Sequence, residues 1–502
     1  MFINEMKKTL NEEFNYSSTE NAALGYRTTG KALLDLNFKV AYLRKASEAE
    51  ILDLFMKAFY EDKLLAVKWL FYARDAREGL GERRLFKIVI EYLCRHNPEI
   101  IGDLIRHIPE YGRFDDMLCI IGTRHTDIVI DIIKAQLKDD EQKMAEGNPV
   151  SLLAKWLPSP NTSSKYTVAK AREIIKLLGM SEPIYRKMLS KLRKHIDVVE
   201  VKMSRNQWGD IKYEAVPSRA NLIYRHAFLR NDEERRRAFL AALEKGETKI
   251  NASVLYPHDI VHKYQENYRE YHELHNFDAA LEEMWKALPN TVNENTNTIV
   301  VADGSGSMFC GIGGTNVTAL SVANALAIYF AERSSGQFKD NYITFSETPQ
   351  LVDFSKCSSL REKIELALRH NEVANTNIEA VFDLILTTAA NKQMKQSELP
   401  QNILIISDME FDVAMYDNRP DKRLFLTIAN RYKQEGYKLP RLIFWNVNSR
   451  TGTIPVIEND LGVALVSGFS VNIVKMVLSG ELDPYKCLVD QLMSERYARI
   501  VL

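Results

Sequence analysis

Two serines and an aspartate at alternate positions after an apolar stretch have the residue types and spacing of a metal site. Residues 298–314 read TIVVADGSGSMFCGIGG, which places Asp303, Ser305 and Ser307 directly after five mostly β-branched or apolar residues. In an extended loop, alternate side chains point the same way, and the intervening glycines permit tight curvature. Carboxylate and hydroxyl oxygens suit a hard divalent cation, Mg²⁺ or Mn²⁺. The spacing therefore predicts an oxygen-only cation site.

Two further segments supply oxygen ligands. Thr376 lies in ANTNIEAVFDLI, just before an expected helix, and Asp408 follows the apolar run NILIIS. Because the carboxyl ends of parallel strands meet at one edge of a sheet, we expect both residues to lie beside the Asp303 loop. One alternative is a hydrogen-bonded turn of Asp303 and its serines without a metal. A phosphate-binding loop is a weaker alternative, because GSGSMFCGIGGT lacks the lysine of a P-loop.

Two regions of different periodicity must position these residues. Up to about Leu288, apolar residues recur three and four apart, which predicts amphipathic helices and favours a HEAT-like helical repeat over an irregular bundle. After the Asn- and Thr-rich segment LPNTVNENTNT, the apolar runs TIVVA, NYITF, NILIIS, RLIFWNV and VALVSG alternate with helical stretches. This alternation predicts a doubly wound parallel sheet of Rossmann-like α/β type. We therefore expect a multidomain α + α/β chain, with helical repeats over 1–290 and the α/β domain over 291–502.

Composition narrows the class of protein. The 502 residues carry a net charge of -1, so no whole-chain field attracts nucleic acid or membrane. Five widely spaced cysteines form no C-x-x-C pair and indicate reduced thiols. The first residues contain no apolar signal region, and no apolar run is long enough to span a membrane. These features predict a cytoplasmic protein without membrane contact.

The charge is unevenly distributed. Residues 151–250 hold 21 Lys and Arg against 11 Asp and Glu, whereas residues 251–300 hold 3 against 8. Basic side chains interleaved with an aromatic residue can neutralise phosphates and stack on bases. The candidate RNA-binding residues are Arg186, Lys187, Lys191, Arg193, Lys194, Lys202, Arg205 and Trp208. The alternative is a solvated basic face, balanced by the acidic segment or by a protein partner.

The motifs DGSGS, NTN and ISDMEF together resemble the metal-ion-dependent adhesion site (MIDAS) of von Willebrand factor A (vWA) domains. The resemblance implies that Ser305, Ser307 and Thr376 bind the metal directly, while Asp303 and Asp408 act through waters. It also implies that a carboxylate from a protein partner completes the metal shell.

The whole chain resembles the Ro ribonucleoprotein autoantigen and its TROVE relatives. The segments WLFYARDAREGLGERRLFKIVIEYL and IPEYGRFDDML carry this resemblance in the helical part. The chain is still more similar to an uncharacterised two-part family of bacteria, phages and eukaryotes, through segments such as SLLAKWLPSPNTSS and INASVLYPHDIVHKY. The Ro resemblance implies binding of small structured RNAs or single-stranded ends on a basic helical surface.

Hydrolytic chemistry has little support. The segment HDIVH spaces His258 and His262 as on a zinc-protease helix, but Asp259 stands where the catalytic glutamate would be. No nucleophile elbow or Walker motif is present. The Arg-rich segments RDAREG and GLGERR are interpreted as an inter-helix salt-bridge network rather than a phosphate clamp. We therefore expect a non-enzymatic, RNA-binding ribonucleoprotein component, with a protein-interaction scaffold as the alternative.

Overall fold

The chain forms two compact units, each assembled from separate parts of the sequence. The first comprises residues 1–66 and 255–496, and the second comprises residues 67–254 and 497–502. The boundary expected near residue 290 falls inside the first unit. The computed structural model describes residues 6, 14–196, 198–268, 273–292, 297–312, 315–345, 348–371, 377–412, 414–416, 419–421, 424–455, 463–468 and 483–502.

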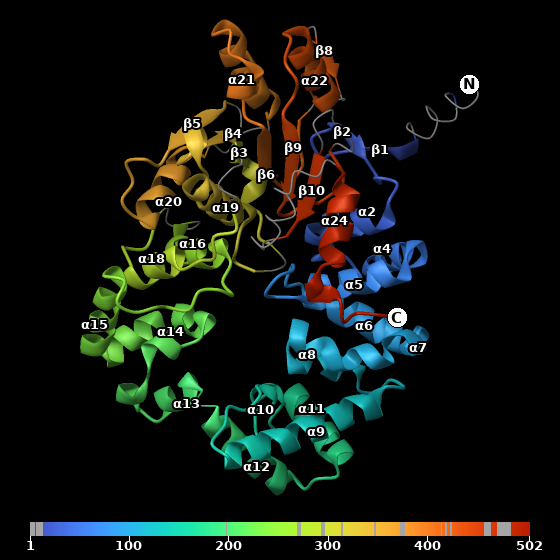
Figure 1. Cartoon of the computed structure of the whole chain (residues 1–502), viewed down its shortest axis with the longest axis vertical. Coiled ribbons are helices and arrows are strands. Elements are labelled where there is room, and N and C mark those ends of the chain that lie inside the picture. Colours follow the sequence, from blue (N-terminus) through green and yellow to red (C-terminus); the bar gives the residue numbers. More distant parts are fainter. Residues whose placement is uncertain are drawn as a thin grey trace. The chain divides into compact units, whose positions relative to one another are not determined.

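A six-stranded sheet forms the centre of the first unit (Figure 1). Its order is β10-β9-β6-β3-β4-β5, and all neighbours pair in parallel except β5, which is antiparallel to β4. Because the chain places β4 on one side of β3 and β6 on the other, β3 is the topological switch point, where open α/β sheets bind ligands. The strands are β3 (Thr298–Asp303), β4 (Asn341–Phe345), β5 (Gln350–Asp353), β6 (Asn402–Ser407), β9 (Arg441–Asn446) and β10 (Val463–Ser467).

Helices cover both faces of this sheet. Phe444 and Trp445 are successive residues of β9, so their side chains point to opposite faces. Phe330 of α19 (Ala319–Arg333) packs 5.5 Å from Trp445, whereas Phe425 of α22 (Leu424–Gln434) packs 5.1 Å from Phe444, measured between ring centroids. Strands buried on both faces are continuously apolar, which is why the sequence shows no alternation. The predicted α + α/β fold class is confirmed.

Four further helices of the first unit pack on α19, on α22 or on one another. Glu282 of α18 accepts a hydrogen bond from the backbone N–H of Leu360 at 2.7 Å, and so satisfies a free donor at the start of α20. In Figure 1 these helices lie around the sheet, in green to orange. They are α16 (Pro257–Gln265), α18 (Ala279–Lys286), α20 (Leu360–Arg369) and α21 (Glu379–Asn391), and a small antiparallel pair, β7 (Ala414–Tyr416) and β8 (Arg419–Asp421), precedes α22.

The N-terminal part of the chain also belongs to the α/β unit. Strands β1 (Tyr16–Ser18) and β2 (Leu24–Tyr26) form an antiparallel hairpin, and Tyr26 bridges to Ile454 after β9. Helices α2 (Ala32–Phe38) and α24 (Pro484–Leu492) pack on each other and against β10. The short α3 (Val40–Leu43) leads to α4 (Glu48–Glu61), which begins with a capping box of Ser47 and Glu50.

The second unit is helical, and the C-terminal residues of the chain pack within it. Tyr497 stacks on Tyr111 with ring centroids 5.6 Å apart, and its backbone carbonyl accepts a hydrogen bond from Lys68 at 2.6 Å. Helix α5 (Lys63–Arg74) passes from the first unit into the second. The other helices, coloured from blue to green in Figure 1, are α6 (Arg84–His96), α7 (Pro98–Ile101), α8 (Ile108–Tyr111), α9 (Thr126–Ala145), α10 (Leu153–Trp156), α11 (Lys165–Leu178), α12 (Glu182–His195), α13 (Val199–Ser204), α14 (Ser218–Asn231) and α15 (Glu233–Glu244). Among the described residues, no helix has the length and apolar content needed to cross a membrane.

Candidate functional site

Asp303 ends the central strand β3 as a fully buried carboxylate. Its Oδ1 accepts a hydrogen bond from the backbone N–H of Ser305 at 2.9 Å. Its Oδ2 accepts a hydrogen bond from the hydroxyl of Ser407 at 2.6 Å, and Ser407 is the last residue of the neighbouring strand β6. The carboxyl ends of the two strands at the switch point therefore fix the orientation of this carboxylate.

The two serines of the loop complete the cluster with a second carboxylate. The hydroxyls of Ser305 and Ser307 lie 3.1 Å apart. Ser307 also hydrogen-bonds the side chain of Asp408, which follows β6 and is fully buried. Asp303, Ser305, Ser307 and Asp408 thus converge on one point of the sheet edge. The fifth predicted ligand, Thr376, lies outside the described residues.

Burial and repulsion between the carboxylates dominate the electrostatics of this cluster. Burial and the adjacent charge of Asp303 raise the pKa of Asp408 to about 7, against the opposite effects of Arg450 and Ser307. Burial also raises the pKa of Asp303, although hydrogen bonds from Ser305 and Ser407 oppose this shift. Two buried acids this close disfavour ionisation of both unless a cation compensates them.

The donor set fits a hard divalent cation. Carboxylate and hydroxyl oxygens are the ligands that Mg²⁺ and Mn²⁺ prefer, and the repulsion between the two acids would be relieved by a dication. Within the described ranges, no group of three or more His, Cys, Asp or Glu side chains is placed to hold a metal ion. A metal at this edge would therefore depend on Ser305 and Ser307, and the metal itself stays a prediction.

Three residues next to the cluster were not identified from the sequence. Those near Asp408 are Ser407, Glu410 and Arg450. Arg450 Nη2 lies 3.5 Å from Asp408 Oδ2. The buried carboxylate of Glu410 accepts hydrogen bonds from the backbone N–H groups of Arg450 and Thr451, each at 3.0 Å. The polar residues in IISDMEF, directly after an apolar strand, were the available signal. Arg450 lies in a separate loop and gave no local signal.

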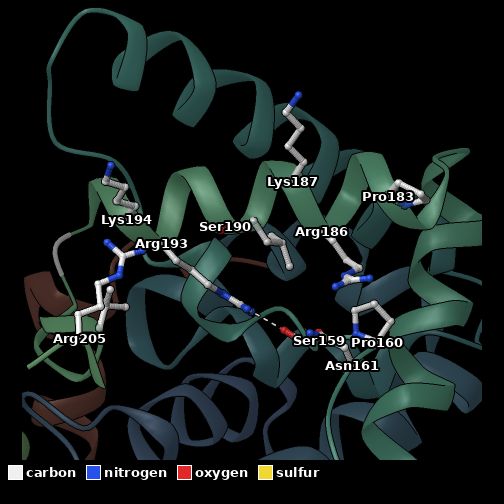
Figure 2. A pocket seen from close by; sticks show the side chains of 12 residues that line it. Ser159, Pro160, Asn161, Pro183, Arg186, Lys187, Ser190, Arg193, Lys194 and Arg205 are labelled. Carbon is white, nitrogen blue, oxygen red and sulfur yellow. Dashed lines mark hydrogen bonds between the residues drawn. The ribbon is translucent and has the colours of Figure 1, made fainter. Parts of the chain in front are cut away.

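A basic pocket lies in the second unit and is lined by one side of α12, by residues before α11 and by Val201 and Arg205 at α13. It has a volume of about 570 Å³ and is shown in Figure 2. Of the eight predicted RNA-binding residues, Arg186, Lys187, Arg193, Lys194 and Arg205 line it, together with Ser159, Asn161 and Ser190. Within the described part of the chain, none of these five cations pairs with a carboxylate.

Arg193 holds one wall of the pocket in place. Its guanidinium donates hydrogen bonds to the carbonyls of Ala154 and Leu157, both at 2.8 Å, and to the hydroxyl of Ser159 at 2.7 Å (Figure 2). Cations bind favourably to the free carbonyls at a helix C-terminus, here that of α10. Burial lowers the pKa of Arg193. Arg193 therefore fixes the Ser159 loop on α12 and brings a positive charge to the pocket.

The other three predicted RNA-binding residues do not line the pocket. Lys191 is exposed elsewhere on α12. Lys202 donates a hydrogen bond to the carbonyl of Asp210 at 2.8 Å, and Trp208 packs edge-on against Phe228 at 6.4 Å. Trp208 is therefore half-buried and contacts Phe228, and base stacking by its indole stays a prediction.

The Arg-rich segments form the expected ion-pair network. The buried carboxylate of Asp116 binds Arg74 at 2.6 Å and Arg83 at 2.8 Å. Arg113 stacks on Trp156 at 3.7 Å from the ring centroid. These contacts give Arg74 and Arg83, together with Arg113 outside the two segments, a structural role in the second unit.

Comparisons with known proteins cover both units. Residues 297–495 match a family described as "Domain of unknown function (DUF7788)", and residues 19–106 and 163–297 match "Domain of unknown function (DUF2828)". The chain is 30% identical over 518 residues to "Uncharacterized protein L728" of Acanthamoeba polyphaga mimivirus, covering 95% of this chain and 87% of that protein. Among solved structures, the crystal structure of the Deinococcus radiodurans Ro (RSR) protein is similar, with a TM-score of 0.44 and 15% identity over 88% of this chain and 93% of that chain.

Proposed function

The chain belongs to the same family as protein L728 of Acanthamoeba polyphaga mimivirus, and we propose that it is a non-enzymatic, Ro-like RNA-binding protein. The single observation that carries this proposal is the pocket on α12, where five cations gather without a carboxylate partner in the described residues. Like charges repel, so such a cluster is stabilised by an anionic ligand. Phosphates of RNA are anions of the required kind, and arginines bind them with two parallel hydrogen bonds.

Salt dependence tests the proposal directly. We would measure binding of a fluorescent 20-nucleotide single-stranded RNA by anisotropy at several salt concentrations. If the pocket neutralises several phosphates, the logarithm of the association constant falls linearly with the logarithm of the salt concentration. The slope is about -0.7 for each phosphate neutralised on a single strand. The quadruple variant R186Q/K187Q/K194Q/R205Q should bind at least about tenfold more weakly at low salt, with a shallower slope.

A matched control separates the pocket from net charge. Arg95, Arg106, Lys143 and Arg237 are exposed in the same unit, but each already pairs with a carboxylate on its own helical segment. The variant R95Q/R106Q/K143Q/R237Q removes the same number of charges and should keep most of the affinity. Equal losses in both quadruple variants would contradict a specific role for the pocket.

A second candidate function is contact with a protein partner at the sheet edge. The cluster of Asp303, Ser305, Ser307 and Asp408 favours it, because a bound Mg²⁺ or Mn²⁺ would offer an open coordination position to a partner's carboxylate. Manganese binding can be followed by electron paramagnetic resonance. The Ser307→Ala variant should bind Mn²⁺ more weakly than the protein itself, whereas Ser397→Ala, an exposed serine of the same unit, should not.

A further inference from the structure

We propose that the α12 pocket recognises the terminal phosphate monoester of an RNA strand, rather than an internal phosphodiester. This inference rests on the proposed RNA binding, and it adds that the pocket recognises the end of the strand. Backbone tracking is typically done by an open positive groove. The pocket is instead a partly open hollow of limited extent, and its volume of about 570 Å³ falls within the range of sites for small molecules, so it matches one nucleotide-sized group.

The described residues that line the pocket present donors and include no carboxylate. Arg186, Lys187, Lys194 and Arg205 are exposed cations at its rim, and the hydroxyl of Ser190 and the amide of Asn161 have no hydrogen-bond partner among the residues described. In the view of Figure 2, Arg186 extends toward Pro160 and Asn161. Arg and Lys carry donors only, so the set is complementary to a group with several acceptor oxygens.

The walls are fixed before any ligand arrives. Arg193 ties the loop at Ser159 to α12 through its three hydrogen bonds, and the hydroxyl of Tyr185 donates to the carbonyl of Pro158 at 2.9 Å. Burial raises the pKa of Tyr185, so this phenol stays protonated and keeps donating. A preorganised wall reduces the ordering cost of binding a small group.

Charge decides between the two kinds of phosphate. At pH 7 a terminal monoester carries a charge of about -1.5 to -2 and three strong acceptor oxygens, whereas an internal diester carries one charge. The attraction to uncompensated cations grows with the charge of the ligand, and the additional oxygen accepts another charge-assisted hydrogen bond. We therefore expect the pocket to prefer the monoester by about tenfold.

The experiment compares ligands that differ only in this charge. The full chain is titrated with one single-stranded RNA sequence carrying a 5′-phosphate, a 3′-phosphate or hydroxyls at both ends. A second titration uses a ribonucleoside 5′-monophosphate and its O-methyl ester, which removes one charge and almost nothing else. We expect one of the phosphorylated RNAs to bind about tenfold more tightly than the RNA with hydroxyls at both ends. The monophosphate should likewise bind about tenfold more tightly than its O-methyl ester. The exposed-residue variants R186Q and R205Q should abolish this preference, and R95Q should keep it.

The outcomes separate this inference from RNA binding itself. If the three RNAs bind equally well, the monoester preference is overturned while RNA binding stands. If the monophosphate outcompetes its methyl ester but no RNA binds, both RNA binding and the assignment to an RNA terminus are overturned, and the pocket is a site for a free phosphate monoester. A phosphoserine peptide that binds as tightly as the phosphorylated RNA would overturn the assignment to a nucleotide.

Discussion

The guanidinium of Arg450 lies 3.5 Å from the buried carboxylate of Asp408 and 2.6 Å from the carboxylate of Glu20. This arginine connects the N-terminal segment of the chain to the candidate metal site of the same unit. Because a cation bound at Asp408 and the guanidinium would be attracted to the same carboxylate, Arg450 would compete with a metal ion there.

Removing this competitor should strengthen metal binding. The Arg450→Gln variant should bind Mn²⁺ roughly three- to tenfold more tightly, because a positive charge close to the ion is lost in a partly screened environment. Isothermal titration calorimetry or electron paramagnetic resonance measures the affinity. Arg369→Gln is the control, since Arg369 is exposed in the same unit and pairs with Glu365 instead. Unchanged or weaker Mn²⁺ binding in Arg450→Gln would argue against competition for Asp408.

The hydroxyl of Ser407 should stabilise the fold even without a metal. Its hydrogen bond of 2.6 Å goes to a fully buried side chain, and leaving a buried partner without its hydrogen bond costs about 1–3 kcal/mol. The Ser407→Ala variant should lower the free energy of unfolding of the first unit by an amount in this range. Chemical denaturation measures it, and the exposed Ser397→Ala should change the value by less than about 0.5 kcal/mol. A loss no greater than that of the control would show that Asp303 does not depend on Ser407.

The sheet could be predicted from the sequence because its signal is local. The runs TIVVA, NYITF, NILIIS, RLIFWNV and VALVSG correspond to β3, β4, β6, β9 and β10, all buried on both faces. The edge strand β5 was missed because its residues QLVD alternate between buried and exposed positions and form no continuous apolar run. The Asp303 loop was found for the same local reason, as polar residues directly after a buried strand.

Contacts between distant segments could not be predicted in this way. Nothing in residues 14–66 indicates that they pack in the α/β unit, because the pairing of Tyr26 with Ile454 joins positions more than four hundred residues apart. The contact of Arg450 with Asp408 also joins two separate segments of the chain. The basic residues of α12 were visible as a charge run, but only the fold separates pocket residues such as Arg186 from Lys202 and Trp208, which are used within the unit.

The stability of the second unit should depend on acidic pH through Asp116. Burial alone would raise the pKa of Asp116, but Arg74, Arg83 and the backbone of Arg113 bring it below its usual value. A carboxyl with a depressed pKa in the folded state stabilises the fold above its unfolded pKa, about 3.9, and this stabilisation is lost as pH falls through the folded pKa.

The Asp116→Asn variant tests this dependence. At pH 7 it should lower the free energy of unfolding by about 3–5 kcal/mol, because the buried guanidinium of Arg74 loses its charged partner. The difference from the unmodified protein should shrink below about pH 4. Asp103→Asn is the control, since its pair with Arg106 is exposed and contributes about 0–1 kcal/mol. A difference that stays constant down to pH 2 would contradict the role of the ionised carboxylate.

Glu410 should anchor the N-terminal hairpin to the sheet edge. Its buried carboxylate accepts hydrogen bonds from the backbone N–H of Glu20 at 2.7 Å and from those of Arg450 and Thr451, each at 3.0 Å. Replacing it in Glu410→Gln removes the charge and leaves too few acceptors for these donors. Hydrogen exchange followed by mass spectrometry should then show faster exchange in the hairpin and in the loop after β9.

A second variant should displace the same hairpin without altering any charge. A side chain at Gly25 would place its Cβ 2.5 Å from Thr453 and 2.6 Å from the carbonyl oxygen of Ile454, so Gly25→Ala must push the hairpin away. It should therefore accelerate exchange in the same peptides as Glu410→Gln, while peptides of the second unit keep their rates. Gly30→Ala is not a suitable control, because Gly30 has a φ of 81° that strains alanine; Ser397→Ala serves instead. If both hairpin variants exchange at the original rate, the anchoring contacts do not hold the segment in solution.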